Sequence, residues 1–155
     1  RPKILFKMLA NISQAVRYLA RGLTMDDRKL QPLIREIRIQ NERKYAEAAY
    51  FFVLEALDFT IFLEGRGQKP CDGRHISPQE LLSGLRRYAQ EEFGPLAPYA
   101  FRSWGVHSTG DFGSLVFQMC EAGLLNKTER DKPQDFANGF DFEVAFQEGE
   151  SVSGT

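Results

Sequence analysis

Apolar side chains recur at helical spacing near the start of the chain, between residues 4 and 20. Their positions follow one another at intervals of three and four residues, which is typical of an amphipathic helix. They are Ile4, Leu5, Met8, Leu9, Ile12, Ala15, Val16 and Leu19. The opposite face includes Lys7, Arg17 and Arg21. A Thr24–Asp27 capping box then predicts a second helix that ends near Asn41.

The most apolar segment spans residues 45–63 and is apolar on nearly every side, which predicts a central buried helix. A loop rich in glycine and proline follows. Ser77, Pro78 and Glu80 then provide the N-cap, the first-turn proline and the third-position acid of a capping box. The sequence therefore predicts that a helix begins there and that it ends at the Gly94–Pro95 pair.

The pattern continues with a short helix over residues 96–104 and a second capping box at Ser108–Asp111, which opens a helix that ends at Gly123. Residues 140–146 alternate apolar and polar side chains, as a strand does. We expect this strand to pair with residues 124–128 in a small hairpin. The order of these elements predicts a winged helix-turn-helix, and the alternative is a helical bundle with an irregular tail.

The expected fold is mainly α-helical with a small β-hairpin, and its N-terminal helices pack on a winged-helix-like core. Residues 1–24 form a basic amphipathic helical extension and residues 25–146 a single helical domain. Residues 75–146 of that domain are the winged-helix-like part, and residues 147–155 are a disordered tail. The residues expected in the core are Phe52, Leu54, Leu57, Trp104, Leu115, Val116 and Met119.

Charge divides the chain into two unequal parts. Residues 1–25 contain five basic residues and no acid, a formal charge of +5, whereas the remainder carries −6. An acidic body disfavours general binding to nucleic acids, which needs clustered lysine and arginine. The two cysteines, Cys71 and Cys120, have no local partner, which favours a reducing compartment and a cytoplasmic location. No apolar run is long enough for a transmembrane helix.

Four longer segments carry a resemblance to a known group of proteins. They are AAYFFVLEALDF at 48–59, HISPQELLSGLRRYAQEEFGPLA at 75–97, WGVHSTGDFGSLVFQMCEAGLL at 104–125 and FDFEVAF at 140–146. From Leu30 to Phe146 the chain resembles an uncharacterised protein family of planctomycetes and verrucomicrobia. The resemblance implies no activity, because that family has no assigned function.

Few residues suggest chemistry. Glu55 and Asp58 share one face of the apolar helix and are candidates for a pocket with acid–base function, although pairing with an arginine explains them better. His75 and His107 each precede a capping box, and hydrogen bonding within a loop is the simpler role for both. Neither histidine belongs to a set with metal-ligand spacing, so we expect no metal and no cofactor.

Two surfaces are candidates for binding. On the last long helix, Phe117, Gln118 and Glu121 occupy the recognition position of a winged helix, but this face has no cation for DNA contact. On the N-terminal helix, Lys7, Arg17 and Arg21 could face RNA or an anionic membrane surface. The alternative is that the N-terminal helix docks its apolar face on the body.

We therefore expect a non-enzymatic cytoplasmic domain with a protein-interaction or regulatory role, and a protein as its partner. A nucleic-acid-associated protein that uses the basic helix is the second hypothesis. An enzyme with a pocket formed around Glu55 and Asp58 is the third.

Overall fold

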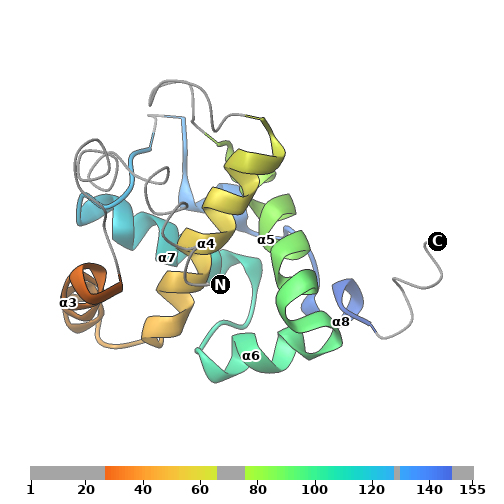
Figure 1. Cartoon of the computed structure of the whole chain (residues 1–155), viewed down its shortest axis with the longest axis horizontal. Helices are drawn as coiled ribbons and strands as arrows, with labels where there is room; N and C mark the ends of the chain where they lie inside the picture. The colour runs from red at the N-terminus through yellow and green to blue at the C-terminus, as the bar shows by residue number, and fades with distance from the viewer. Residues whose placement is uncertain (1–26, 66–75, 128–129, 148–155) are drawn as a thin grey trace.

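The computed structural model describes residues 27–65, 76–127 and 130–147 (Figure 1). The predicted helix at residues 4–20, with Lys7, Arg17 and Arg21, lies outside the described residues, as do the Thr24 cap, Cys71, His75 and residues 148–155. The elements are α3 Asp27–Gln40, α4 Glu47–Leu63, α5 Pro78–Phe93, the 3-10 helix η2 Gly94–Leu96, α6 Ala97–Ser103, α7 Thr109–Glu121, the 3-10 helix η3 Pro133–Phe136 and α8 Phe142–Ala145. The protein is mainly helical, as predicted.

The predicted capping box before α5 is confirmed. The Glu80 backbone N–H donates to the Ser77 Oγ at 3.1 Å, and the Ser77 N–H donates to the Glu80 Oε1 at 3.0 Å. The predicted capping box before α7 is also present, and in it the Asp111 Oδ2 accepts from the Ser108 N–H at 3.3 Å. Both helices therefore begin at the residues that the sequence indicates.

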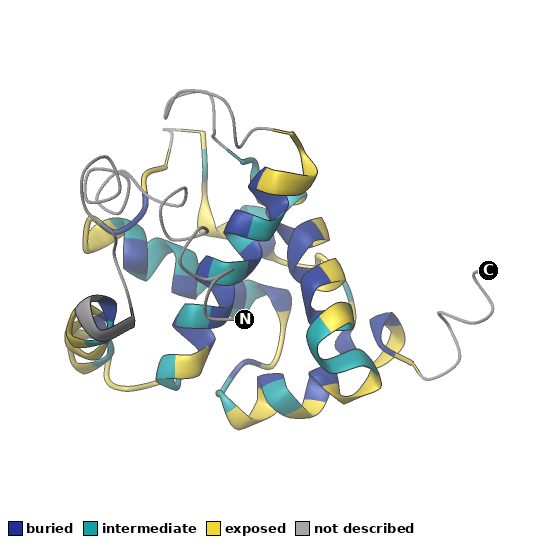
Figure 2. Cartoon of the chain, in the orientation of Figure 1, coloured by how far each residue is buried: buried dark blue, intermediate teal, exposed yellow. Residues whose placement is uncertain are grey.

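Helix α4 is the central element, packed on α3, α5 and α7 (Figures 1 and 2). Of the residues predicted for the core, Phe52, Leu54, Leu115 and Met119 are buried, whereas Leu57, Trp104 and Val116 are half-buried. Helix α4 is also less enclosed than its composition predicts, because Phe62 and Leu63 at its C-terminal end are exposed.

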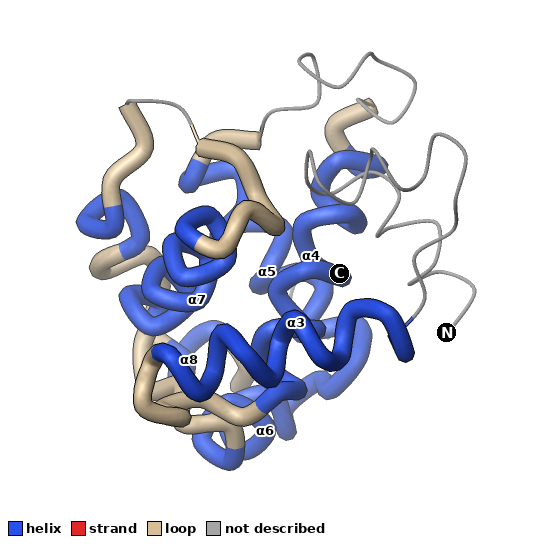
Figure 3. Tube along the Cα trace, turned by 90° about the vertical axis from the view of Figure 1, so that its left-hand side faces the viewer, coloured by secondary structure: helices blue, strands red, loops and turns tan. Residues whose placement is uncertain are grey.

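The predicted hairpin is wrong, because the described residues contain no strand (Figure 3). Residues 142–145 form the helical turn α8 instead, and the Asp141 side chain caps it by accepting from the Glu143 N–H at 2.8 Å. The buried residues of this segment are Phe142, Ala145 and Phe146. Their spacing of three and four positions is helical, whereas Val144, which strand alternation would bury, is exposed.

Helices α4 and α5 approach each other closely at Gly84. A Cβ placed on Gly84 would lie 1.7 Å from the Thr60 Oγ1 and 2.8 Å from the Thr60 Cβ. The Thr60 hydroxyl is itself held by donation to the Ala56 carbonyl at 2.7 Å. Only glycine therefore allows this separation of the two helices, a requirement that the amphipathic pattern of α5 does not reveal.

We predict that Gly84→Ala lowers the free energy of unfolding by about 1–3 kcal/mol, because the added methyl group forces the two helices apart. Urea denaturation followed by circular dichroism measures the change. Gly110→Ala is the control, since its added Cβ would meet only the Ser108 Oγ at 3.4 Å. Equal stability of Gly84→Ala and the original chain would contradict the close approach of α4 and α5.

Candidate functional site

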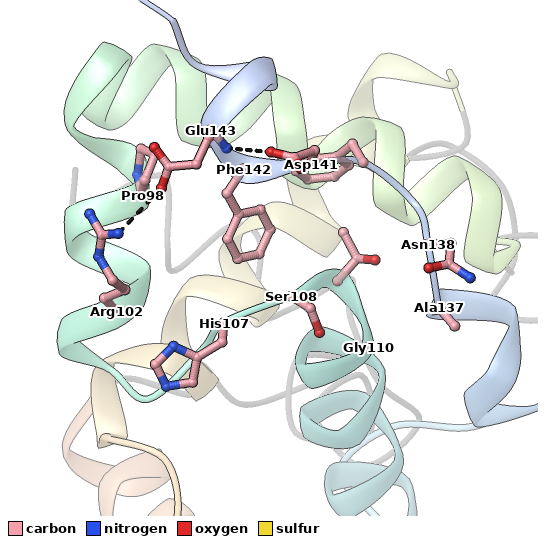
Figure 4. Close-up of a pocket in the computed structure, with 12 residues that line it drawn as sticks. Pro98, Arg102, His107, Ser108, Gly110, Ala137, Asn138, Asp141, Phe142 and Glu143 are labelled. Carbon is pink, nitrogen blue, oxygen red and sulfur yellow. Dashed lines mark hydrogen bonds and ion pairs between the residues drawn. The ribbon is translucent and has the colours of Figure 1, made fainter.

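An open pocket of about 640 Å³ lies between α6, the start of α7 and the segment that leads into α8 (Figure 4). Its walls are formed by Pro98, Arg102, His107, Ser108, Thr109, Gly110, Ala137, Asn138, Phe140, Asp141, Phe142 and Glu143. The pocket combines aromatic surface with a few polar groups, which is the usual composition of a binding site. Of the predicted site residues that the structure describes, His107 alone lines this pocket.

Thr109 fixes one wall of the pocket. Its side chain is buried, and its Oγ1 donates to the Phe136 carbonyl at 2.6 Å while accepting from the Gly139 N–H at 2.9 Å. These two bonds hold residues 136–139 against the first turn of α7. The sequence indicated Ser108 as the cap of this helix but carried no signal that the next residue would join it to a segment 27 positions later.

The opposite wall joins α6 to α8. The Arg102 Nη1 lies 3.2 Å from the Glu143 Oε1, and both side chains are largely exposed. Behind this ion pair the Phe142 ring packs on Phe101 with ring centroids 4.8 Å apart. Figure 4 shows the Phe142 ring pointing into the pocket. An exposed ion pair contributes little stability, so the aromatic contact is the stronger attachment of α8.

Asp111 holds the loop before α7 but does not orient the His107 ring. Its Oδ2 accepts from the backbone N–H of His107 at 2.8 Å as well as from that of Ser108. Its Oδ1 accepts from the Tyr45 hydroxyl at 2.5 Å and faces the Lys44 Nζ at 3.9 Å. The carboxylate is therefore used in shaping the chain, and the geometry gives no acid–histidine–nucleophile relay at this place.

Glu55 and Asp58 are residues of α4 and do not line this pocket. The Tyr88 hydroxyl donates to the Glu55 Oε1, which joins α4 to α5. Asp58 is buried, with 6% of its surface exposed. Neither residue lines the pocket that contains His107, so the described structure does not assemble them with a histidine.

The predicted recognition face of α7 is only partly open to solvent. Gln118 is half-buried and accepts a hydrogen bond from the Tyr50 hydroxyl of α4. Phe117 is also half-buried, with its ring edge-on to Phe136 at 6.5 Å. Glu121 is exposed, so one of the three candidates on this helix is free to reach a partner.

Burial changes the proton affinity of groups around α7. Burial raises the pKa of Tyr50 to about 12, and it raises that of Tyr45 further, with the hydrogen bond to Asp111 as the second cause. Burial also raises the pKa of Cys120 to about 11, so its thiol is protonated and unreactive at neutral pH. None of these three groups is prepared for acid–base catalysis near pH 7.

No group of histidine, cysteine and acidic residues that could hold a metal ion occurs in the described ranges. Among those same residues, no helix is long and apolar enough to cross a membrane. No protein-family model, curated protein or solved structure matches the chain.

Tyr50 gives a prediction for alkaline pH. Its pKa is higher in the folded protein, at about 12, than in the unfolded chain, where it is about 10. Its contribution to stability is therefore complete below pH 10 and is lost as the pH rises toward 12. We expect Tyr50→Phe to lower the free energy of unfolding by about 1 kcal/mol at pH 8, because it removes the hydrogen bond to Gln118. Between pH 10 and 12 the stability of this variant should fall less than that of the original chain.

Urea midpoints at pH 8, 10, 11 and 12 measure this difference. The exposed Tyr99→Phe is the control and should follow the original chain at every pH. Tyr45 still titrates in the Tyr50→Phe variant, so the alkaline decline becomes smaller but does not vanish. If the urea midpoints of Tyr50→Phe and the original chain fall equally with rising pH, folding does not raise the pKa of Tyr50 and the prediction is wrong.

Proposed function

We propose that this chain is a non-enzymatic, cytoplasmic protein-interaction domain that binds its partner through one surface formed by α6 and α8. We call it the α6–α8 surface, and it consists of Leu96, Tyr99, Arg102, Glu143 and Val144. Helices α6 and α8 lie in contact, and the Arg102–Glu143 ion pair joins them.

The observation that carries the proposal is the exposure of large apolar side chains on this surface. Leu96 is 63% exposed, Tyr99 64% and Val144 56%. The Arg102 guanidinium lies 4.9 Å from the centre of the Tyr99 ring, which holds the ring in place. Tyrosine and arginine are enriched among the residues that dominate binding energy at protein interfaces.

The open pocket adjoins the α6–α8 surface and shares Arg102 and Glu143 with it. Pro98, Phe140 and Phe142 give it an apolar lining. The partner that fits is a protein segment whose aromatic or aliphatic side chain enters the pocket while its flanks cover Tyr99 and Val144. Such an anchor beside an exposed aromatic rim is the usual arrangement of an interface centre.

The other hypotheses have less support. The order of α5, α6 and α7 agrees with a helix-turn-helix core, but Gln118 on the expected reading face bonds to Tyr50 and Glu121 is acidic. This disfavours DNA binding by α7. Glu55 and Asp58 do not line the pocket that contains His107, so that pocket gives no support to an enzyme based on them. Membership of the uncharacterised family that residues 30–146 resemble is part of this proposal and adds no activity to it.

Peptide selection tests the proposed surface. Peptides are selected from a random displayed library against the full chain, and their dissociation constants are measured by fluorescence anisotropy. We expect the selected peptides to carry an aromatic or large aliphatic residue. We also expect Tyr99→Ala to raise the dissociation constants of these peptides at least ten-fold, because Tyr99 supplies exposed contact area.

The matched control is Leu33→Ala, which removes an exposed apolar side chain from α3. It should leave the affinities unchanged, and thermal melts should show both variants folded. Peptides that lose affinity through Leu33→Ala and not through Tyr99→Ala would overturn the assignment of the α6–α8 surface.

A further inference from the structure

One sector of α4 is only partly covered by the described helices, because its Phe51 and Phe59 pack on the core from one side and its Phe62 is exposed. Its residues follow at intervals of three and four along the helix, so they share one face, here called the outward face of α4. They are Ala48, Phe51, Glu55, Phe59 and Phe62. Phe62 is 76% exposed, Ala48 is exposed, and Phe51 and Phe59 are half-buried. Three phenylalanines on one partly exposed helix face are unusual unless another element covers them.

The outward face is held rigidly from below. The Phe59 ring packs on the Tyr88 ring with centroids 5.2 Å apart, and the Tyr88 hydroxyl donates to Glu55 in the middle of the face. Both contacts come from α5, which packs more extensively on α4 than any other element does. The middle of the face is therefore fixed in position by α5.

The spacing of the outward face matches the apolar stripe of residues 4–20. Leu5, Met8, Ile12, Val16 and Leu19 also follow one another at intervals of three and four residues. Leu5 to Leu19 and Ala48 to Phe62 each span 15 residues, or about 21 Å of helix. Two helices with this periodicity pack along their length, with the side chains of one between those of the other.

Charge favours the same pairing. Residues 1–25 hold five basic residues and no acid. The acidic and basic residues between positions 47 and 64 are all acidic, namely Glu47, Glu55, Asp58 and Glu64, and Glu47 also pairs with Arg35 and Arg38. The N-terminal segment, with a charge of +5, is therefore attracted to this acidic helix at long range, whereas a second copy of α4 would be repelled.

The connection is long enough. Helix α3 begins at Asp27 and packs against the start of α4, where the Gln31 Nε2 lies 3.1 Å from the Glu47 Oε1. Residues 21–26 can span about 20 Å when extended. Residues 21–26 are thus long enough to let the preceding segment reach α4.

We propose that residues 4–20 dock as a helix on the outward face of α4, within the same chain. The docked helix covers Phe51, Phe59 and Phe62 and places its basic side toward solvent. The segment then belongs to the folded body and is not a free membrane or RNA anchor. This inference is independent of the α6–α8 surface.

Trypsin cleavage of the full chain after Arg17 and Arg21 tests the docking, with the products identified by mass spectrometry. A helix docked on the body resists cleavage, and cleavage becomes faster when the helix is released. We expect Phe62→Glu to raise the rate of cleavage after Arg17 at least ten-fold, because it places a charge in the exposed part of the apolar strip. Ile12→Glu, on the other side of the contact, should give the same increase.

Ile39→Glu is the matched control, since it puts the same charge on an exposed apolar position of α3 and should leave the rate unchanged. Thermal melts of each variant establish that the body is folded. Equal cleavage rates for the original chain and the Phe62→Glu variant would overturn the proposal.

Two further measurements separate other occupants of the face. Light scattering that shows a dimer dissociated by Phe62→Glu would overturn the proposal in favour of a second copy. Slow cleavage only in the presence of phosphatidylserine vesicles would overturn it in favour of a membrane surface. A monomer that is protected without vesicles supports docking within the chain.

Discussion

The packing of Phe52 and Phe101 is the contact on which the rest of the structure depends. Phe52 on α4 packs on Tyr88 of α5, on Trp104 and on Phe112 of α7, and its ring centroid lies 5.6 Å from that of Phe101 on α6. Phe101 in turn packs on Phe142 of α8. One continuous aromatic cluster thereby joins five helices, so each helix is positioned relative to all the others. The pocket exists because this cluster holds α8 close to α6 while Thr109 holds residues 136–139 on α7.

The orientation of α4 follows from the same cluster. With Phe52 directed toward α6 and α7, and with Thr60 against Gly84 of α5, Phe51 reaches the core only at its edge and Phe62 is largely exposed. An apolar composition on all sides of α4 predicted complete burial, and Phe62 shows where this prediction fails. The described helices leave Phe62 exposed. A further element that covers it would explain why α4 is apolar on this side as well.

Local signals were predicted well because their physics is local. The reciprocal bonds of Ser77 and Glu80 depend on residues three positions apart, so the sequence identifies them directly. The strand prediction for residues 140–146 was wrong because a segment of seven residues can fit strand alternation and helical spacing at once. The Asp141 cap favours the helical turn. The bond between Tyr50 and Gln118 joins residues 68 positions apart, and no local pattern contains it. The pocket was missed for the same reason, since its walls meet only through tertiary contacts.

The two candidate surfaces differ in what determines their partner. Burying a large apolar side chain contributes about 1.5–3 kcal/mol, whereas an exposed ion pair contributes about 0–1 kcal/mol. In the docking proposed for the outward face of α4, the phenylalanines therefore supply most of the binding energy, and the acidic charge of α4 contributes less. On the α6–α8 surface Arg102 and Glu143 pair with each other. Their charges therefore contribute little to the choice of partner, and the shapes of the exposed side chains contribute more. The docking proposed for residues 4–20 uses the outward face of α4 alone, so Tyr99 and the adjoining pocket stay open to a separate protein.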